Sequence, residues 1–120
     1  MKICVTASGE GLDAAVDSRF ARAPFMVVVD EDSGEVESLP NPAVEAGHGA
    51  GIQAAQIVSR LGAGVVLTAH CGPKAFDVLD AAGIEVFGAG DGTVAEAVDA
   101  WKSGGLERLR SADSQAGWGG

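Results

Sequence analysis

Hydrophobic and polar positions alternate in the first forty residues in a way that predicts three strands. Ile3, Val5 and Ala7 alternate with their neighbours, which predicts a first strand over about residues 2–8. The apolar run at residues 25–29 predicts a second, largely buried strand. Residues 35–39 alternate between charged and apolar side chains, as expected for a half-exposed strand at the edge of a sheet.

The rest of the chain changes to a helical period interrupted by short apolar runs. Apolar side chains at helical spacing predict one helix over residues 50–61, a second over residues 73–82 and a third that begins after Thr93. Between these helices, residues 64–68 and 84–87 are apolar runs typical of interior parallel strands. The predicted element order is therefore βββαβαβα.

This order predicts a single-domain α/β fold that is RNase-H-like. Three meandering strands followed by right-handed crossovers give a five-stranded mixed sheet in the order 3-2-1-4-5, with strand 2 antiparallel and helices flanking the sheet. Residues 1–105 form this domain, and the polar, glycine-rich residues 106–120 are expected to be a flexible C-terminal tail.

The predicted topology brings several loops to one edge of the sheet. Strands 1, 3, 4 and 5 run parallel, so residues 9–23, 40–49, 69–73 and 88–92 leave the sheet at the same side. The strand order reverses between strands 1 and 4, which is where open α/β sheets bind ligands. We therefore expect the functional site at this edge.

Both histidines and one cysteine stand just before a predicted helix N-terminus. His48 lies between Gly47 and Gly49, and His70 and Cys71 precede the second helix. Helix N-termini carry unpaired N–H groups that bind anions, and a cysteine there has a lowered thiol pKa. Each residue also has a structural interpretation. His48 can be a solvated loop histidine, His70 can hydrogen-bond a loop, and Cys71 can be a small buried side chain.

Composition and charge limit the ligands that this edge can bind. The net charge of −9 argues against nucleic-acid backbones and acidic membrane surfaces, and no apolar run is long enough to span a bilayer. Two cysteines without an export signal indicate reduced thiols and a cytoplasmic location. An anionic ligand must be held by local donors, for which Arg19 and Arg22 are the nearest cations.

Other chemistries find less support in the residues. No paired C-x-x-C or H-x₃-H spacing indicates a zinc site. Residues 88–92 look like a nucleotide-binding loop but lack the P-loop lysine, and the first strand lacks the carboxylates of a metal-dependent nuclease. A small cysteine-dependent hydrolase would combine Cys71 with His48 or His70 and Asp91.

Three motifs carry a resemblance to a known family. Asp-Ser-Arg-Phe-Ala-Arg-Ala-Pro-Phe at residues 17–25, Gly-His-Gly-Ala-Gly at residues 47–51 and Cys-Gly-Pro-Lys-Ala at residues 71–75 resemble the dinitrogenase iron–molybdenum cofactor biosynthesis family. The resemblance covers about residues 1–103. It implies an RNase-H-like domain that carries a molybdenum-containing metal–sulfur cluster without catalysing a reaction. The cluster is a mixed molybdenum–copper sulfide in small single-domain members, or iron–molybdenum cofactor or its precursors in others.

Together, the residue patterns and the resemblance predict a cluster-binding site. Its predicted cofactor-binding residues are Arg19, Arg22, Gly47, Gly49, Gly51, Gly72 and Lys74, and its predicted metal contacts are His48, His70 and Cys71. The alternative is a protein-interaction or regulatory module that uses the same glycine-rich edge. Further expectations are a monomer or weak dimer, and protein partners from a cluster-delivery or cell-division-type complex.

Overall fold

A mixed sheet forms the centre of the computed structural model, which describes residues 1–46 and 48–110. Its strands are β1 (Lys2–Ala7), β2 (Phe25–Asp30), β3 (Val36–Pro40), β4 (Ala63–Thr68), β5 (Glu85–Gly88) and β6 (Glu107–Leu109). They are hydrogen-bonded in the order β3-β2-β1-β4-β5-β6. β1, β4 and β5 are parallel to one another, whereas β2 is antiparallel to both β1 and β3, and β6 is antiparallel to β5.

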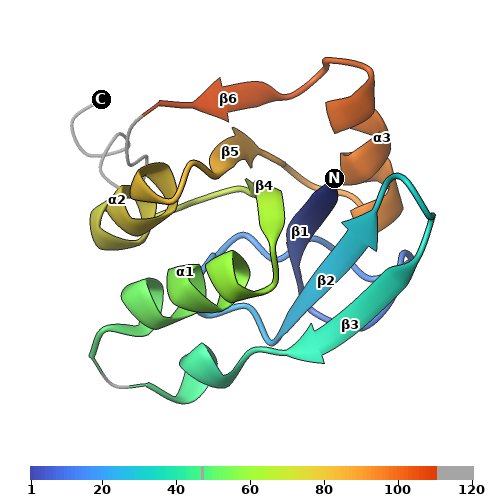
Figure 1. Cartoon of the computed structure of the whole chain (residues 1–120). Helices are drawn as coiled ribbons and strands as arrows, with labels where there is room; N and C mark the ends of the chain where they lie inside the picture. The colour runs from blue at the N-terminus through green and yellow to red at the C-terminus, as the bar shows by residue number, and fades with distance from the viewer. Residues whose placement is uncertain (47, 111–120) are drawn as a thin grey trace.

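Helices cover both faces of the sheet (Figure 1). They are the short 3₁₀ helix η1 (Pro42–Glu45) and the α-helices α1 (Ala50–Arg60), α2 (Pro73–Ala81) and α3 (Val94–Lys102). Alternation along β1 divides the core, because Cys4 packs with side chains of α1 and α2, whereas Ile3 and Val5 pack with those of α3. α1 and α2 therefore cover one face and α3 covers the other.

The first five strands confirm the predicted order and directions, but the predicted count is wrong by one. β6 pairs with β5 within the segment that the sequence assigned to the tail. It has only three residues, and its Arg108 forms an ion pair with Glu85 at 3.2 Å between Nη1 and Oε2. A short, charged edge strand has no apolar alternation to reveal it. Residues 111–120 of the predicted tail lie outside the described residues.

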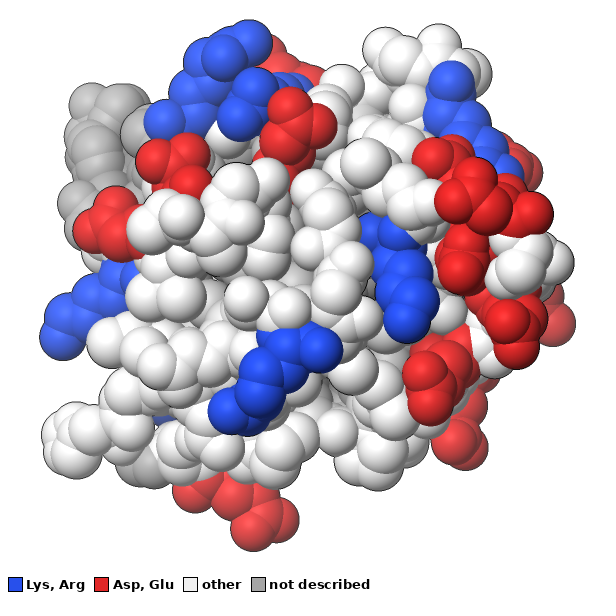
Figure 2. Space-filling model, in the orientation of Figure 1, with Lys and Arg blue, Asp and Glu red and all other residues white. Residues whose placement is uncertain are grey.

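Charge is distributed unevenly over the surface. Figure 2 shows acidic side chains gathered over the β2–β3 side of the molecule, while the face over α1 is largely uncharged. The β2–β3 hairpin and its ends contribute Asp30, Glu31, Asp32, Glu35 and Glu37. None of the helices among the described residues combines the length and apolar character needed to cross a membrane.

Candidate functional site

The two halves of the loop between β1 and β2 (residues 8–24) lie beside different helices. Its first half, residues 8–16, covers the N-terminus of α3, where the N–H groups of Val94 and Ala95 donate to the carbonyls of Ala14 and Leu12 at 2.9 and 3.0 Å. Thr93 adds a capping box with Glu96. Protein groups therefore already occupy the N-terminus of α3.

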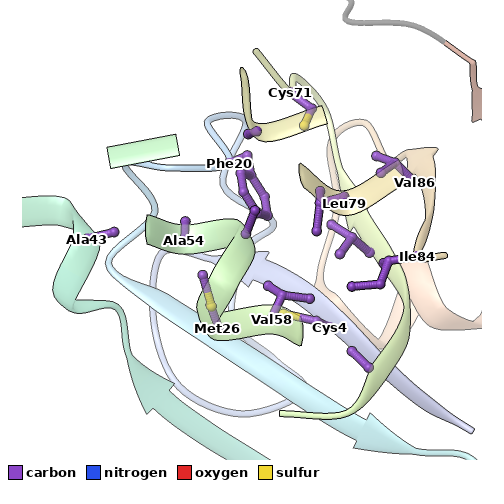
Figure 3. Packing of buried hydrophobic residues seen from close by; sticks show 14 residues of the cluster. Cys4, Phe20, Met26, Ala43, Ala54, Val58, Cys71, Leu79, Ile84 and Val86 are labelled. Carbon is purple, nitrogen blue, oxygen red and sulfur yellow. The ribbon is translucent and has the colours of Figure 1, made fainter. Parts of the chain in front are cut away.

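The second half of the loop, residues 17–23, runs beside the segment between β4 and α2. The N–H of His70 donates to the carbonyl of Ser18 at 3.0 Å, and the N–H of Phe20 donates to the carbonyl of His70 at 3.2 Å. The Phe20 side chain is buried in the core cluster among residues of α1 and α2 (Figure 3). These contacts fix the arginine-bearing part of the loop against the sheet.

A cavity of about 390 Å³ opens between this half of the loop and the N-termini of α1 and α2. Its lining residues are Arg19, Phe20, Ala21, Arg22, Gly51, His70, Gly72, Pro73, Lys74 and Ala75. The first turns of the two helices are close: a Cβ atom added to Gly51 would lie 3.2 Å from the Cβ of Ala75. Glycine at position 51 therefore allows both N-termini to reach one cavity.

Neither of these N-termini receives a side-chain cap from the described residues. Within α1 the first hydrogen bond runs from the N–H of Gln53 to the carbonyl of Gly49, and within α2 from Phe76 to Gly72, both at 2.9 Å. The N–H groups that precede these donors, including that of Gly51, have no acceptor within their own helix. Together with the two helix dipoles, they make the cavity favourable for an anion.

The lysine and arginine side chains that line the cavity give its lining a positive charge. Arg19, Arg22 and Lys74 are three of the eight lysines and arginines in the whole chain. Among the residues that the structure describes, no aspartate or glutamate lines the cavity. A locally cationic cavity in a chain of net charge −9 is the electrostatic feature that separates this site from the rest of the surface.

Arg22 also connects the loop to the segment that leads into α1. Its Nη1 donates to the carbonyls of Val44 and Ala46 at 3.3 and 3.1 Å. Beneath it, the buried amide of Asn41 donates to the carbonyls of Ala21 and Ala23 at 3.2 and 2.9 Å. Asn41 therefore holds the loop in place, although it is not among the residues that the sequence predicted for the site.

Comparison with known proteins shows the family and the fold of the chain. The model of the family described as dinitrogenase iron-molybdenum cofactor matches residues 1–104. The chain belongs to this family. The apo form of the orange protein from Desulfovibrio gigas has the same fold with a TM-score of 0.89 and 44% identity, over 92% of this chain and 94% of that one.

Two further relatives extend the comparison within the family. A putative NifB protein from Thermotoga is 34% identical with a TM-score of 0.82, over 92% of this chain and 94% of that one. An uncharacterized protein from Methanocaldococcus jannaschii is 28% identical over 93 residues, which cover 75% of this chain and 79% of that protein. The chain is thus similar to proteins from Desulfovibrio gigas, Thermotoga and Methanocaldococcus jannaschii.

The structure brings together six of the ten predicted site residues of this family member. Those that line the cavity are Arg19, Arg22, Gly51, His70, Gly72 and Lys74. Gly49 lies outside the lining and caps α1 with a φ of 74°, in the left-handed region that favours glycine. His48 is exposed and does not line the cavity, and Gly47 lies outside the described residues.

Cys71 has a different environment from the one that its sequence position suggests. Its side chain is fully buried in the core cluster between the sheet, α1 and α2, as Figure 3 shows. It does not line the cavity, so burial favours the structural interpretation of this residue over a metal contact. Within the described part of the chain, no three His, Cys, Asp or Glu side chains gather closely enough to hold a metal ion.

The groups proposed for a cysteine-dependent hydrolase do not converge. Cys71 is inaccessible, whereas Asp91 lines a separate cavity with Gly90 and Glu96 near α3. Burial also raises the pKa of the other thiol, Cys4, to about 12, so that it is protonated at neutral pH. Both cysteine side chains are buried, whereas a nucleophilic thiolate must be accessible to its substrate.

Four lining residues were not predicted as part of the site. Phe20, Ala21, Pro73 and Ala75 form apolar walls between the cationic groups. Phe20 and Ala21 lie between the two arginines of the motif at residues 17–25, and this position was the signal that could have placed them in the site. Their apolar character reads as core in a sequence, and only the fold shows that they also face a cavity.

Proposed function

We propose that this protein is a non-catalytic carrier that binds an anionic molybdenum-containing metal–sulfur cluster in the cavity between α1, α2 and the β1–β2 loop. The observation that carries the proposal is the convergence of three cations and two uncapped helix N-termini on one cavity in an acidic chain. The same donors suit a compact polyanion, since its charge can be shared among many weak contacts.

The walls of the cavity favour a cluster over a strongly hydrated anion. Phe20, Pro73 and Ala75 offer apolar surface, which contacts polarizable sulfides at a lower desolvation cost than it contacts oxygen anions. Without a dense set of metal ligands among the described residues, the cargo is a preformed cluster held mainly through its sulfides. His70 at the cavity is the candidate for a direct contact to copper or iron.

The finer identity of the cargo follows from the family resemblance. We propose a mixed molybdenum–copper sulfide first, because the resemblance implies that cluster for small single-domain members, and the 44% identity with the orange protein extends over nearly the whole of both chains. A cluster of the iron–molybdenum cofactor type is the second choice, since the family model carries that description. The proposal also includes an RNase-H-like classification of the fold and a cytoplasmic site of action.

Titration of the apo-protein with tetrathiomolybdate and copper(I), followed by visible absorption, tests the carrier role. We expect tight binding that Lys74→Ala weakens about tenfold, equivalent to about 1.4 kcal/mol, because one cation at the N-terminus of α2 is lost. Lys102→Ala is the matched control, since Lys102 ends α3 on the other face of the sheet. Equal affinities for the two variants, or no binding at all, would instead favour a protein-interaction module.

A further inference from the structure

Arg19 at the cavity is held by the carboxylate of Asp17, two residues earlier in the loop. Nε of Arg19 donates to Oδ1 of Asp17 at 3.2 Å, Nη2 donates to Oδ2 at 3.3 Å, and the backbone N–H of Arg19 donates to Oδ1 at 2.9 Å. Two donors of the guanidinium are thereby committed, and three of its five N–H groups remain for a ligand. The carboxylate fixes the plane of the guanidinium as well as its position.

The backbone of Asp17 is in turn hydrogen-bonded to Thr6 in the central strand β1. Its N–H donates to the carbonyl of Thr6 at 2.9 Å, and the Thr6 hydroxyl is hydrogen-bonded to the carbonyl of Asp17 and to the hydroxyl of Thr68, each at 2.9 Å. Thr6 and Thr68 are fully buried in adjacent strands β1 and β4. A continuous network therefore runs from the buried sheet through Asp17 to Arg19.

The two members of the pair differ in exposure. The Asp17 side chain is 9% exposed and does not line the cavity, whereas the Arg19 side chain is 63% exposed and does. Burial raises the pKa of Asp17, but the hydrogen bonds and charge of Arg19 lower it by more, so the net shift is downward and the carboxylate is ionised at neutral pH. A permanent negative charge thus lies directly behind a cationic site.

We propose that Asp17 is a positioning residue that raises the affinity of the site for its anionic cargo by holding the guanidinium of Arg19 in place. The inference rests on the proposed carrier function and adds a residue that none of the predicted sites included. Simple electrostatics predicts the opposite sign, because removing a carboxylate beside an anion site should tighten binding. The ordering of Arg19 outweighs that repulsion, since an exposed arginine otherwise loses rotamer entropy on binding.

Asp17→Asn tests whether loss of the carboxylate weakens or tightens cluster binding, measured by the same titration with tetrathiomolybdate and copper(I). We expect roughly fivefold weaker binding, because the amide cannot accept both guanidinium hydrogen bonds. Asp13→Asn is the matched control: it removes the same charge from an exposed position of the same loop, and its affinity should stay equal or rise slightly. The thermal midpoint of each variant and the ¹⁵N relaxation of Arg19 Nε in the apo-protein separate local ordering from general destabilisation.

A second variant shows whether Asp17 acts through Arg19. In an Arg19→Ala background, adding Asp17→Asn should weaken binding no further, because the group that Asp17 positions is absent. If Asp17→Asn binds as tightly as the wild type or more tightly, the positioning role is wrong while the carrier role stands. If it weakens binding equally with and without Arg19, Asp17 acts on the fold and the inference is also wrong. If the wild type binds no cluster, both the carrier role and the inference fail.

Discussion

The helices α1, α2 and α3 all follow strands of the same sheet, but the N–H groups at their N-termini differ in their hydrogen bonding. At α3 the loop carbonyls of Leu12 and Ala14 and the capping box of Thr93 accept the first N–H groups. At α1 and α2, glycine precedes the helix and no described side chain caps it. A helix N-terminus becomes a ligand site only when the fold leaves its donors open beside a cavity.

The difference is made by a segment distant from all three helices in sequence. The β1–β2 loop places its first half on α3 and its second half, with Arg19 and Arg22, beside α1 and α2. One loop therefore closes one N-terminus with carbonyl groups and surrounds the other two with cations. The glycine-rich residues 88–92 thus lead from β5 to the capped N-terminus of α3, whereas Gly51 and Gly72 line the proposed site.

The largest effect is expected from a substitution that fills the space between the N-termini of α1 and α2. Gly51→Val would insert a branched side chain where a Cβ already comes within 3.2 Å of Ala75, forcing the first turns of α1 and α2 apart. We expect a loss of about 1–3 kcal/mol in the free energy of unfolding and at least a tenfold loss of cluster affinity, measured by denaturant unfolding and by visible titration. Gln56→Val, exposed on the same helix, is the control. Normal binding by Gly51→Val would show that the cargo lies elsewhere.

The complementary substitution removes the side-chain cap at the N-terminus of α3. Thr93→Ala removes the capping box of α3 and should cost about 1 kcal/mol of stability, while cluster affinity stays at the wild-type value. Thr93→Ser keeps the hydroxyl and should retain most of the stability. A drop in affinity as large as the one at Gly51 would contradict the separation of the two regions.

The hydrophobic pattern of the sequence predicted most of the strands and helices, and it failed for two short elements. Alternation in β1 and β3, apolar runs in β2, β4 and β5, and helical spacing after residue 50 predicted the first five strands, their order and the three α-helices. β6 was missed because its three residues pair only through contacts with β5. The short helix η1 was missed because its four residues are too few to show a helical period, although Asn41 caps it.

The site was predictable only as far as topology alone determines it. Parallel strand ends placed Arg19, Arg22 and His70 at one edge, and all three line the cavity. The direction of each side chain depends on tertiary packing, which is why Cys71 is in the core beside its exposed neighbour His70. The pairing of Asp17 with Arg19 likewise depends on a loop conformation that no sequence period encodes.

The most direct test of the open and closed N-termini is a ¹H–¹⁵N amide titration of the labelled protein with tetrathiomolybdate and copper(I). We predict shifts for the amides of Gly51, Lys74 and Ala75 and for those of the loop residues Arg19, Ala21 and Arg22, because these residues line the cavity. The amides of Val94 and Ala95 should not shift, since carbonyls of the β1–β2 loop already hold them. Shifts centred on α3, or spread evenly over the surface, would contradict the account.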